Sequence, residues 1–342
     1  MTAELHYPLP DPPAPGKLLD VAEGVHWLRM PLPFALDHIN LWLLRDGPGW
    51  VIVDAGFATD ATRAHWETIF AACLDGRPVH RIVATHLHPD HLGLAAWLAR
   101  RFGTDVWMTQ AEFLYARALW TAADPSLPLP FADLFRRHGL DEARTASIAG
   151  RTGAYRRGVP ELPARYRRIA EGDELEIDGR KWRVIVGYGH SPEHAALYCE
   201  SLGLLISGDM VLPRISTNVS VQPLEPEGNP LALFLQSLER YRALPADTLV
   251  LPSHGAVFRG LHPRLDALAQ HHRERFALLE EACRTPRSAA ELLATLFQRE
   301  LDLHQLVFAM GEAIAHLNWL MHAGRLERLD DDGVYRFVRA GT

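Results

Sequence analysis

Residues 85–93 read Thr-His-Leu-His-Pro-Asp-His-Leu-Gly, which places three histidines and one aspartate within six consecutive positions. Residues 81–85 predict a short buried strand before this segment, and residues 92–99 predict a helix after it. His86 and His88 stand two positions apart in extended backbone, so their rings leave the same face of the chain. Imidazole and carboxylate are ligands that borderline metals such as zinc accept. The segment therefore predicts a metal site where a strand meets a helix.

Three more candidate ligands follow predicted strands later in the chain. They are His190, Asp209 and His254, each a few residues beyond the end of a strand and next to a glycine. Taken singly, each is an ordinary loop histidine or turn aspartate. Because neighbouring glycines let the backbone approach an occupied site, and because all three share one topological position, together they predict the rest of a metal site.

The composition is that of an ordinary globular protein. The chain has 342 residues, a length sufficient for one large domain and a smaller one. Hydrophobic residues make up 48% of it and charged residues 23%. A net charge of -7 argues against nucleic-acid binding through bulk electrostatics. Three widely spaced cysteines indicate a reducing compartment, and neither a signal peptide nor a run of about 20 apolar residues is evident. We therefore expect a cytoplasmic protein without a membrane partner.

Residues 1–260 predict a catalytic domain of short strands and helices. The expected strands are residues 25–30, 40–44, 50–54, 81–85, 174–177, 182–186, 195–199, 204–207 and 248–251. Residues 109–165 depart from this alternation and predict a helical insertion. Within it we expect helices over residues 111–121 and 131–148, separated by a proline-rich break at 125–130.

Residues 261–342 predict a smaller C-terminal domain. A long helix is expected over residues 263–283, followed by helices over 288–297 and 305–322 and a hairpin over 325–338. Two helices followed by a two-stranded hairpin is the order of elements in a winged-helix domain. A winged helix that binds nucleic acid needs a basic face. Residues 286–342 instead contain six arginines, no lysine and eight acidic residues, so packing or homodimerisation is the expected role.

The ligand pattern resembles the metallo-β-lactamase fold superfamily. The His-x-His-x-Asp-His motif of that superfamily is found here as His86, His88, Asp90 and His91. Nearly the whole chain, including residues 37–40 and 212–215 and the winged-helix tail, resembles the branch that includes β-lactamase-like protein 2. The resemblance implies an α+β fold, a four-layer αβ/βα sandwich with the site at one edge between the sheets.

The resemblance also implies a ligand set and a cofactor. The implied ligands are His86, His88 and His190 for one metal, Asp90, His91 and His254 for the other, and Asp209 as the bridge. Two zinc ions are the expected cofactors, with iron or manganese as alternatives, because imidazole and carboxylate accept all three.

These ligands predict a metal-dependent hydrolase. Two cations about 3.5–4 Å apart lower the pKa of a bridging water enough to supply a metal-bridging hydroxide at neutral pH. Asp90 is expected to orient that water or accept its proton, and Asp209 makes β-lactam hydrolysis improbable, because true β-lactamases of this fold carry a non-bridging residue there. The expected substrate is a small ester, thioester or lactone. The alternatives are a phosphodiesterase or endoribonuclease of the same fold, an iron-dependent oxygenase, and a non-catalytic metal-bound scaffold.

A second group of residues is predicted to support the ligands or face the substrate. Asp54 is expected to hold a ligand imidazole. The other candidates are His38, Asn40, His194, Arg214 and Asn218. Residues 151–168 contain six arginines and a single acid. Because guanidinium groups suit phosphate and carboxylate, Arg156 and Arg157 are expected to hold an anionic arm of a small-molecule substrate, with a solvated surface as the alternative.

Overall fold

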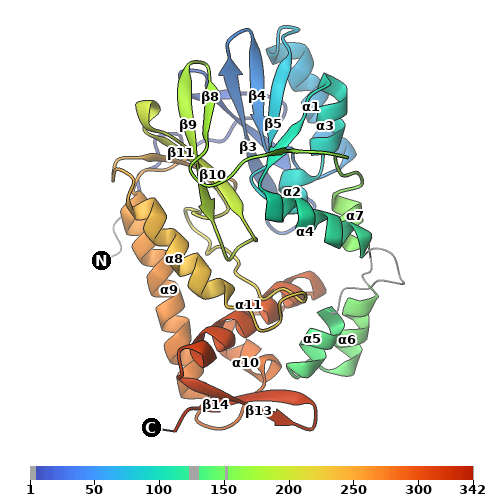
Figure 1. The fold of residues 1–342 in the computed structure, drawn as a ribbon, viewed down its shortest axis with the longest axis vertical. Helices are drawn as coiled ribbons and strands as arrows, with labels where there is room; N and C mark the ends of the chain where they lie inside the picture. Colours follow the sequence, from blue (N-terminus) through green and yellow to red (C-terminus); the bar gives the residue numbers. More distant parts are fainter. Residues whose placement is uncertain (1–4, 123–130, 151–152, 342) are drawn as a thin grey trace.

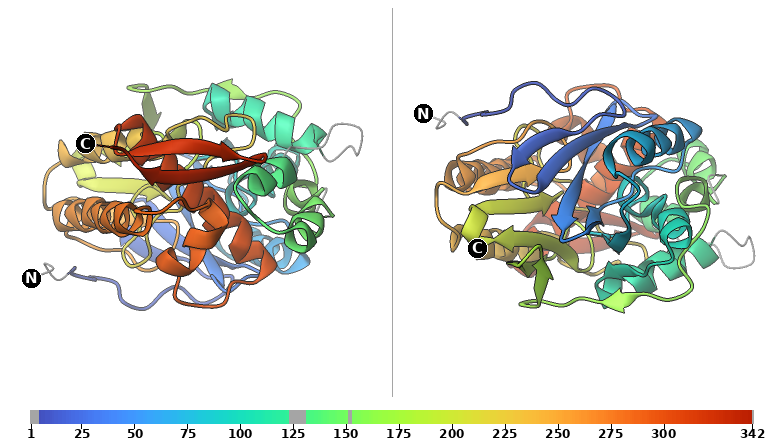
Figure 2. Two further views of the ribbon diagram at one scale, coloured as in Figure 1. Left: turned by 90° about the horizontal axis from the view of Figure 1, so that it is seen from below. Right: turned by 90° about the horizontal axis from the view of Figure 1, so that it is seen from above.

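The computed structural model describes residues 5–122, 131–150 and 153–341. Two β-sheets face each other, and helices cover the outer face of each sheet (Figures 1 and 2). One apolar cluster fills the space between the sheets, and two others lie under the helices of the two outer faces. The predicted α+β class and the four-layer αβ/βα sandwich are confirmed.

The first sheet has seven strands that pair in sequence order. They are β1 (Leu19–Ala22), β2 (Val25–Pro31), β3 (His38–Asp46), β4 (Gly49–Val53), β5 (Val79–Val83), β6 (Val106–Met108) and β7 (Arg167–Arg168). The pairs from β1 to β4 are antiparallel, and those from β4 to β7 are parallel. Because parallel strands end at the same edge of a sheet, β4 and β5 deliver the segments that follow them, with Asp54 and His86, to one place.

The second sheet has five strands in the order β12-β11-β10-β9-β8. They are β8 (Glu174–Ile177), β9 (Arg180–Gly187), β10 (His194–Cys199), β11 (Leu204–Gly208) and β12 (Leu249–Pro252). Only β11 and β12 pair in parallel. β10 is buried along its whole length, because it lies at the centre of the sheet with the other sheet on one face and helices on the other.

Two helices cover each outer face. α1 (Asp60–Cys73) and α3 (Ala95–Phe102) pack on the first sheet, and α8 (Pro230–Arg242) and α9 (Leu261–Ala282) pack on the second. The start of α8 has a clear local cause: the Asn229 side chain accepts a hydrogen bond from the Ala232 amide, and proline occupies the first helical position. No helix in the described ranges is long and apolar enough to cross a membrane.

Each of two helices predicted from the sequence is divided into two helices in the structure. The predicted helix over 92–99 is α2 (Pro89–Leu92) followed by α3, because the Leu94 amide bonds the Gly56 carbonyl oxygen and not the carbonyl oxygen four residues before it. The predicted helix over 131–148 is α5 (Phe131–Arg137) and α6 (Glu142–Ala149). Gly139 between them has φ +87°, a left-handed conformation that ends a helix. The predicted break at 125–130 lies outside the described residues.

The insertion therefore has two parts with different neighbours. α4 (Gln110–Thr121) and α7 (Ala154–Gly158) lie beside α2 and the His-rich segment (Figure 1). α5 and α6 pack instead on the C-terminal helices, where Phe135 joins the same apolar cluster as Leu292.

Several elements were not predicted, and most of them are short. β1, β6 and β7 have four, three and two residues, too few for an alternating pattern to register. α8 was also missed, although its asparagine cap and first-turn proline were readable signals.

The C-terminal region has the predicted order of helices and hairpin. α10 (Ala289–Leu296) and α11 (Leu303–His322) each begin with a capping box, at Ser288 and Asp302, and β13 (Leu326–Asp331) pairs with β14 (Val334–Arg339). Leu292, Ile314 and Leu317 belong to the apolar cluster that also contains Phe234 of α8 and Leu265 of α9. The C-terminal region thus packs on the catalytic region of the same chain. The boundary near residue 260 stays a prediction.

Candidate metal centre

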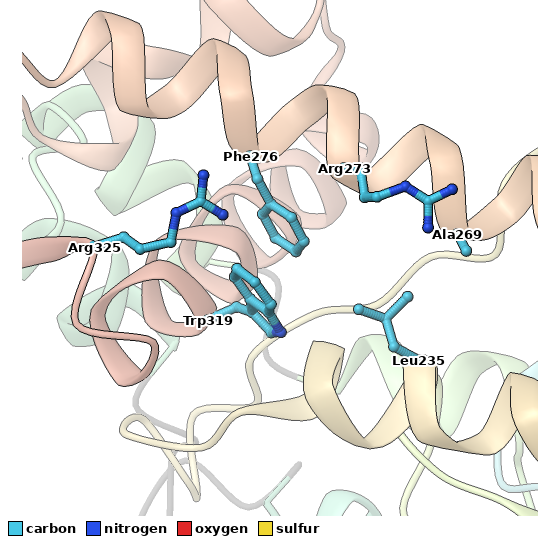
Figure 3. A pocket seen from close by; sticks show the side chains of 6 residues that line it. All are labelled: Leu235, Ala269, Arg273, Phe276, Trp319 and Arg325. Atoms are coloured by element: carbon cyan, nitrogen blue, oxygen red, sulfur yellow. The ribbon is translucent and has the colours of Figure 1, made fainter.

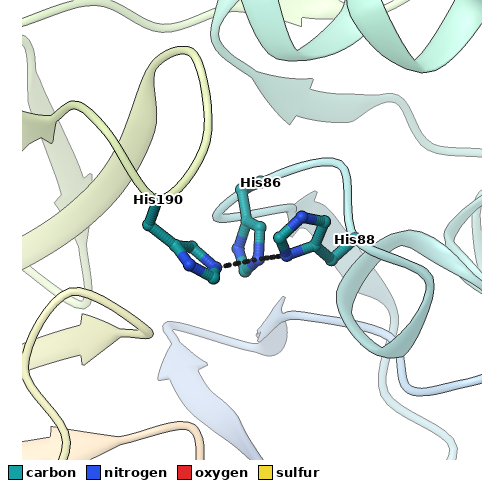
Figure 4. Close-up of side chains that lie close together, drawn as sticks. All are labelled: His86, His88 and His190. Atoms are coloured by element: carbon teal, nitrogen blue, oxygen red, sulfur yellow. Dashed lines mark hydrogen bonds between the residues drawn. The ribbon is translucent and has the colours of Figure 1, made fainter. Parts of the chain in front are cut away.

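Strand ends from both sheets bring the predicted ligands together. His86 follows β5, Asp209 follows β11, and His254 follows β12, while His190 lies in the turn between β9 and β10. Figure 4 shows that the rings of His86, His88 and His190 point toward one another. The His86 Nε2 atom lies 2.9 Å from His88 Nδ1 and 3.2 Å from His190 Nε2. These three nitrogens form one ligand group.

Asp90, His91 and His254 form a second group beside the first. The Asp90 Oδ2 atom lies 3.7 Å from His91 Nε2 and 3.5 Å from His254 Nε2. Asp90 and His91 belong to the short helix α2, and proline at its first position ends the extended segment that carries the earlier histidines. One short segment therefore supplies ligands to both groups.

Asp209 lies between the two groups. Its Oδ2 atom is 3.4 Å from His190 Nε2 in the first group, and its Oδ1 atom is 3.4 Å from His91 Nε2 and 3.5 Å from His254 Nε2 in the second. All seven predicted ligands are thus brought together, with one carboxylate oxygen facing each group.

Two buried atoms without hydrogen-bond partners indicate what this cluster can bind. Within the described part of the chain, the His91 Nε2 and Asp209 Oδ1 atoms are buried and make no hydrogen bond. Buried polar atoms without a partner are rare because they have lost their water. The cluster presents ring nitrogens and carboxylate oxygens to a shared space, which is the donor set of divalent transition metals. The residues therefore fit two divalent cations.

The electrostatics agree with this fit. Burial lowers the pKa of His86 and His88 well below its ordinary value, which keeps both imidazoles neutral, the form that binds metal. Burial acts on His91 in the same direction, but the surrounding carboxylates, Asp54 first, raise its pKa well above the ordinary value. Several acids around one buried imidazole favour a positive charge at this position, which either a proton on His91 or a cation bound at its Nε2 atom would supply.

The other ring nitrogen of each later ligand is held by an oxygen atom. His91 Nδ1 lies 2.8 Å from Asp54 Oδ2, His190 Nδ1 lies 2.8 Å from the Asn218 carbonyl oxygen, and His254 Nδ1 lies 2.8 Å from the His38 carbonyl oxygen. Because each oxygen accepts from Nδ1–H, each imidazole is left with an unprotonated Nε2 facing the cluster. Asp54, Asn218 and His38 from the second predicted group therefore orient the imidazoles of predicted ligands.

Asp54 joins the first sheet to the His-rich segment. Its Oδ1 atom accepts a hydrogen bond of 2.8 Å from the Thr85 amide, and the Thr85 hydroxyl also bonds the carboxylate. The residue has φ +64°, a left-handed conformation that aspartate and asparagine adopt more readily than other residues with a side chain.

His38 and Asn40 hold the loop that carries His254. The His38 Nε2 atom accepts a hydrogen bond of 2.9 Å from the Gly255 amide. The Asn40 side chain donates to the Pro252 and Gly255 carbonyl oxygens at 2.8 and 2.9 Å. Asn40 is fully buried, so it does not face substrate.

The remaining candidates lie in different surroundings. His194 is buried and its Nε2 atom accepts a hydrogen bond of 3.1 Å from the Asp209 amide, so it holds Asp209 by its backbone. Arg214 is exposed and lies over the Tyr7 ring at 5.7 Å, on the side of the N-terminal segment. Arg156 and Arg157 are exposed residues of α7, which packs against α2.

Two residues that contact the ligand loops were not found from the sequence. The Glu112 carboxylate on α4 and the Tyr155 hydroxyl on α7 both bond the peptide groups of Leu87, between two ligands. Burial raises the pKa of Glu112 to about 7. An acid in the first turn of a helix is an ordinary feature, so no local signal marks this one.

A half-open pocket of about 420 Å³ lies away from the ligands, among α8, α9 and α11 (Figure 3). It is lined by Leu235, Ala269, Arg273, Phe276, Trp319 and Arg325. None of these residues belongs to the ligand cluster, so the chemistry is assigned to the cluster and not to this pocket.

Comparisons with known proteins agree with this geometry. A family model described as the metallo-beta-lactamase superfamily matches residues 35–254, and one described as the metallo-beta-lactamase-like C-terminal domain matches residues 276–340. The crystal structure of a beta-lactamase domain protein from Burkholderia ambifaria has a TM-score of 0.92 and 52% identity to this chain, and the match covers 99% of both chains.

Two curated relatives are named hydrolases. The probable metallo-hydrolase YqjP from Bacillus subtilis (strain 168) is 26% identical over 315 residues, 87% of this chain and 92% of that protein. A hydroxyacylglutathione hydrolase from Idiomarina loihiensis is 29% identical over 182 residues, 52% of this chain and 65% of that protein. The resemblance seen in the sequence is therefore confirmed. Since the superfamily model spans every residue of the ligand cluster, the chain belongs to the metallo-beta-lactamase superfamily and is a metal-dependent hydrolase.

Proposed function

We propose that this chain is a dinuclear hydrolase that cleaves a small acyl thioester, ester or lactone. The observation that carries the proposal is the position of Asp209, whose two carboxylate oxygens face different ligand groups. A carboxylate placed in this way would hold two cations as a pair. When bound, such a pair lowers the pKa of a water and polarises the attacked carbonyl group. Zinc suits the donor set best, and iron and manganese remain alternatives.

Asp90 is the residue best placed to handle the proton of the attacking water. Its side chain is 20% exposed, whereas those of His91 and His254 are 0% and 4% exposed. A partly solvated carboxylate beside the ligand imidazoles accepts a proton and passes it to solvent or to the leaving group. The side chain of Asp209 faces both ligand groups, so its role is to join them.

The kinds of relatives favour a thioester among these substrates. The chain matches a hydroxyacylglutathione hydrolase over 182 residues, and the substrate in that protein's name is an acyl thioester. The endoribonuclease alternative loses support from the C-terminal region. α11, the helix that would enter a nucleic-acid groove, is buried along most of its length.

One experiment tests the reaction class. The purified protein is assayed on an aryl ester, an acyl thioester, a lactone, a bis-aryl phosphate and RNA, with bound metal measured in the same samples. We expect turnover of an acyl substrate, and Asp209→Ala should abolish it because the bridge is lost. His194→Ala, which leaves the bridging carboxylate in place, should have a milder effect. Preferred turnover of RNA or the phosphodiester would overturn the proposal.

The proposal extends to the charge of the substrate. α7 presents Arg156 and Arg157 next to α2, and the buried Gly158 that follows them lies against Pro89 of the ligand motif. The position of α7 beside the ligand segment supports a role for these arginines in holding an anionic arm of the substrate, and the Arg156 guanidinium also donates to the Trp120 carbonyl oxygen of α4.

A matched pair of variants tests the charge proposal. Arg156→Ala combined with Arg157→Ala should raise KM for an anionic thioester and leave that of a neutral ester unchanged. Arg165→Ala combined with Arg167→Ala is the control, because both side chains are exposed and paired with Asp105. If the two double variants behave alike, the arginines form only a solvated surface.

A further inference from the structure

The Glu112 carboxylate joins the two loops that carry the first ligand group. Its Oε2 atom accepts a hydrogen bond of 2.9 Å from the Leu87 amide. Its Oε1 atom accepts hydrogen bonds of 2.6 Å from the Ser191 hydroxyl and 2.7 Å from the Glu193 amide. Leu87 stands between His86 and His88, and Ser191 directly follows His190. Every ligand of the group is thus one residue from a bond to this carboxylate.

The backbone that carries His86 and His88 lies outside regular secondary structure. β5 ends at Val83 and α2 begins at Pro89, so the residues that carry His86 and His88 belong to neither element. The Tyr155 hydroxyl donates a hydrogen bond of 2.7 Å to the Leu87 carbonyl oxygen. Leu87 is therefore held at its amide by Glu112 of α4 and at its carbonyl oxygen by Tyr155 of α7. These are the two helices of the insertion that lie beside the metal centre.

We propose that Glu112, supported by Tyr155, is a positioning residue that sets the separation of the two loops forming the His86–His88–His190 group. This inference rests on the proposed dinuclear centre and gives the helical insertion a role in it. Glu112 is fully buried, and a buried carboxylate is costly to maintain unless donors surround it. Here three donors reach its two oxygens, and only a carboxylate accepts all of them.

The role is selective for one of the two ligand groups. Asp54 orients His91, and the His38 carbonyl oxygen orients His254. Neither contact involves the Glu112 carboxylate. Loss of Glu112 should therefore loosen the first group and leave the second unchanged.

Glu112→Gln is the sharpest test. Glutamine keeps the size of the side chain, and its single carbonyl oxygen can accept from the Ser191 side. Its amide then points an N–H group at the Leu87 N–H, so the His86–His88 segment is released. Zinc binding to the full-length chain is measured by competition with a chromophoric chelator. We expect one of two ions to bind 10- to 100-fold more weakly and the other to bind as in the wild type. Cobalt substitution should show a changed visible spectrum for one ion only.

Glu193→Gln is the matched control. Glu193 lies in the same loop as His190, and its carboxylate accepts from the Ala111 amide of α4, but it does not bond Leu87. This variant should keep both ions. The proposal is overturned if Glu112→Gln binds both ions normally, if it weakens both ions equally, or if the control behaves in the same way.

Tyr155→Phe is a second test of the positioning role, for use if the Glu112→Gln variant does not fold. It removes one hydrogen bond at the Leu87 carbonyl and should weaken the same single ion to a smaller extent. Unchanged zinc binding in that variant contradicts the proposal. A wild-type protein that holds only one ion at saturating zinc would instead overturn the dinuclear centre proposed above, so the two failures can be told apart.

Discussion

Replacing Asp54 with asparagine should lower the affinity for the cation at the Asp90–His91–His254 group, because His91 could no longer bind it. Asparagine can still accept from the Thr85 amide through its oxygen, as Asp54 Oδ1 does at 2.8 Å. Its NH₂ group then faces His91 Nδ1, which now lies 2.8 Å from Asp54 Oδ2. The imidazole must accept this hydrogen bond at Nδ1 and carry its proton on Nε2, the atom that faces the ligand cluster.

The size of the effect follows from the kind of contact that is lost. Removing a residue that orients a metal ligand typically lowers metal affinity 10- to 100-fold, which corresponds to about 1.4–2.7 kcal/mol. A reversed proton position places Asp54→Asn at the upper end of this range. The backbone should tolerate the change, because asparagine adopts the left-handed φ of +64° found at this position.

Zinc titration against a competing chelator measures the effect, and circular dichroism checks the fold. Asp20→Asn is the control, since Asp20 Oδ1 also lies 2.6 Å from a histidine Nδ1, that of His26 on β2, which is outside the ligand cluster. The control should bind zinc normally. If Asp54→Asn binds both ions with wild-type affinity, the inferred proton positions and the role of Asp54 are wrong.

Three further outcomes test the fold. In a urea titration, Gly93→Ala should lower the free energy of unfolding by about 1–3 kcal/mol, because the added Cβ would lie 2.4 to 2.7 Å from three backbone oxygens. Gly150→Ala is the control and should leave the free energy of unfolding unchanged, because its nearest contacts lie at 3.6 Å. Burial lowers the pKa of His272 to about 2 and of His316 to about 3. Below pH 6.5 the unfolded chain therefore takes up protons at both histidines, whereas the folded chain does not. The free energy of unfolding should be unaffected by them above pH 6.5 and should decrease by about 1.4 kcal/mol for each histidine with each pH unit below it. Urea unfolding at pH 7 and pH 5.5 should show this loss, and an equal slope in His316→Leu would contradict it. A fragment of residues 1–260 should be poorly soluble by size exclusion, since it exposes the apolar cluster that α10 and α11 cover, and a monomeric, active fragment would disprove this.

The sequence by itself determined the fold class and the chemistry of the ligand set. His86 and His88 share one strand-to-helix junction with Asp90 and His91, so their residue types and spacing are visible within six positions. His190 and Asp209 could also be found, because each follows a predicted strand beside a glycine. Such signals are local, and they report which side chains stand at a strand end.

Only the tertiary structure decided which atoms hold those ligands in place. Asp54 bonds His91 across 37 positions, and Glu112 bonds Ser191 across 79. Contacts of this kind leave no periodic pattern in either segment, since each partner alone is an ordinary buried or helical acid. The split of residues 131–148 into two helices follows the same rule, because Gly139 packs against Ser288 of the C-terminal region. The donor set was therefore readable along the chain, whereas the orientation of its imidazoles depended on residues that come together only on folding.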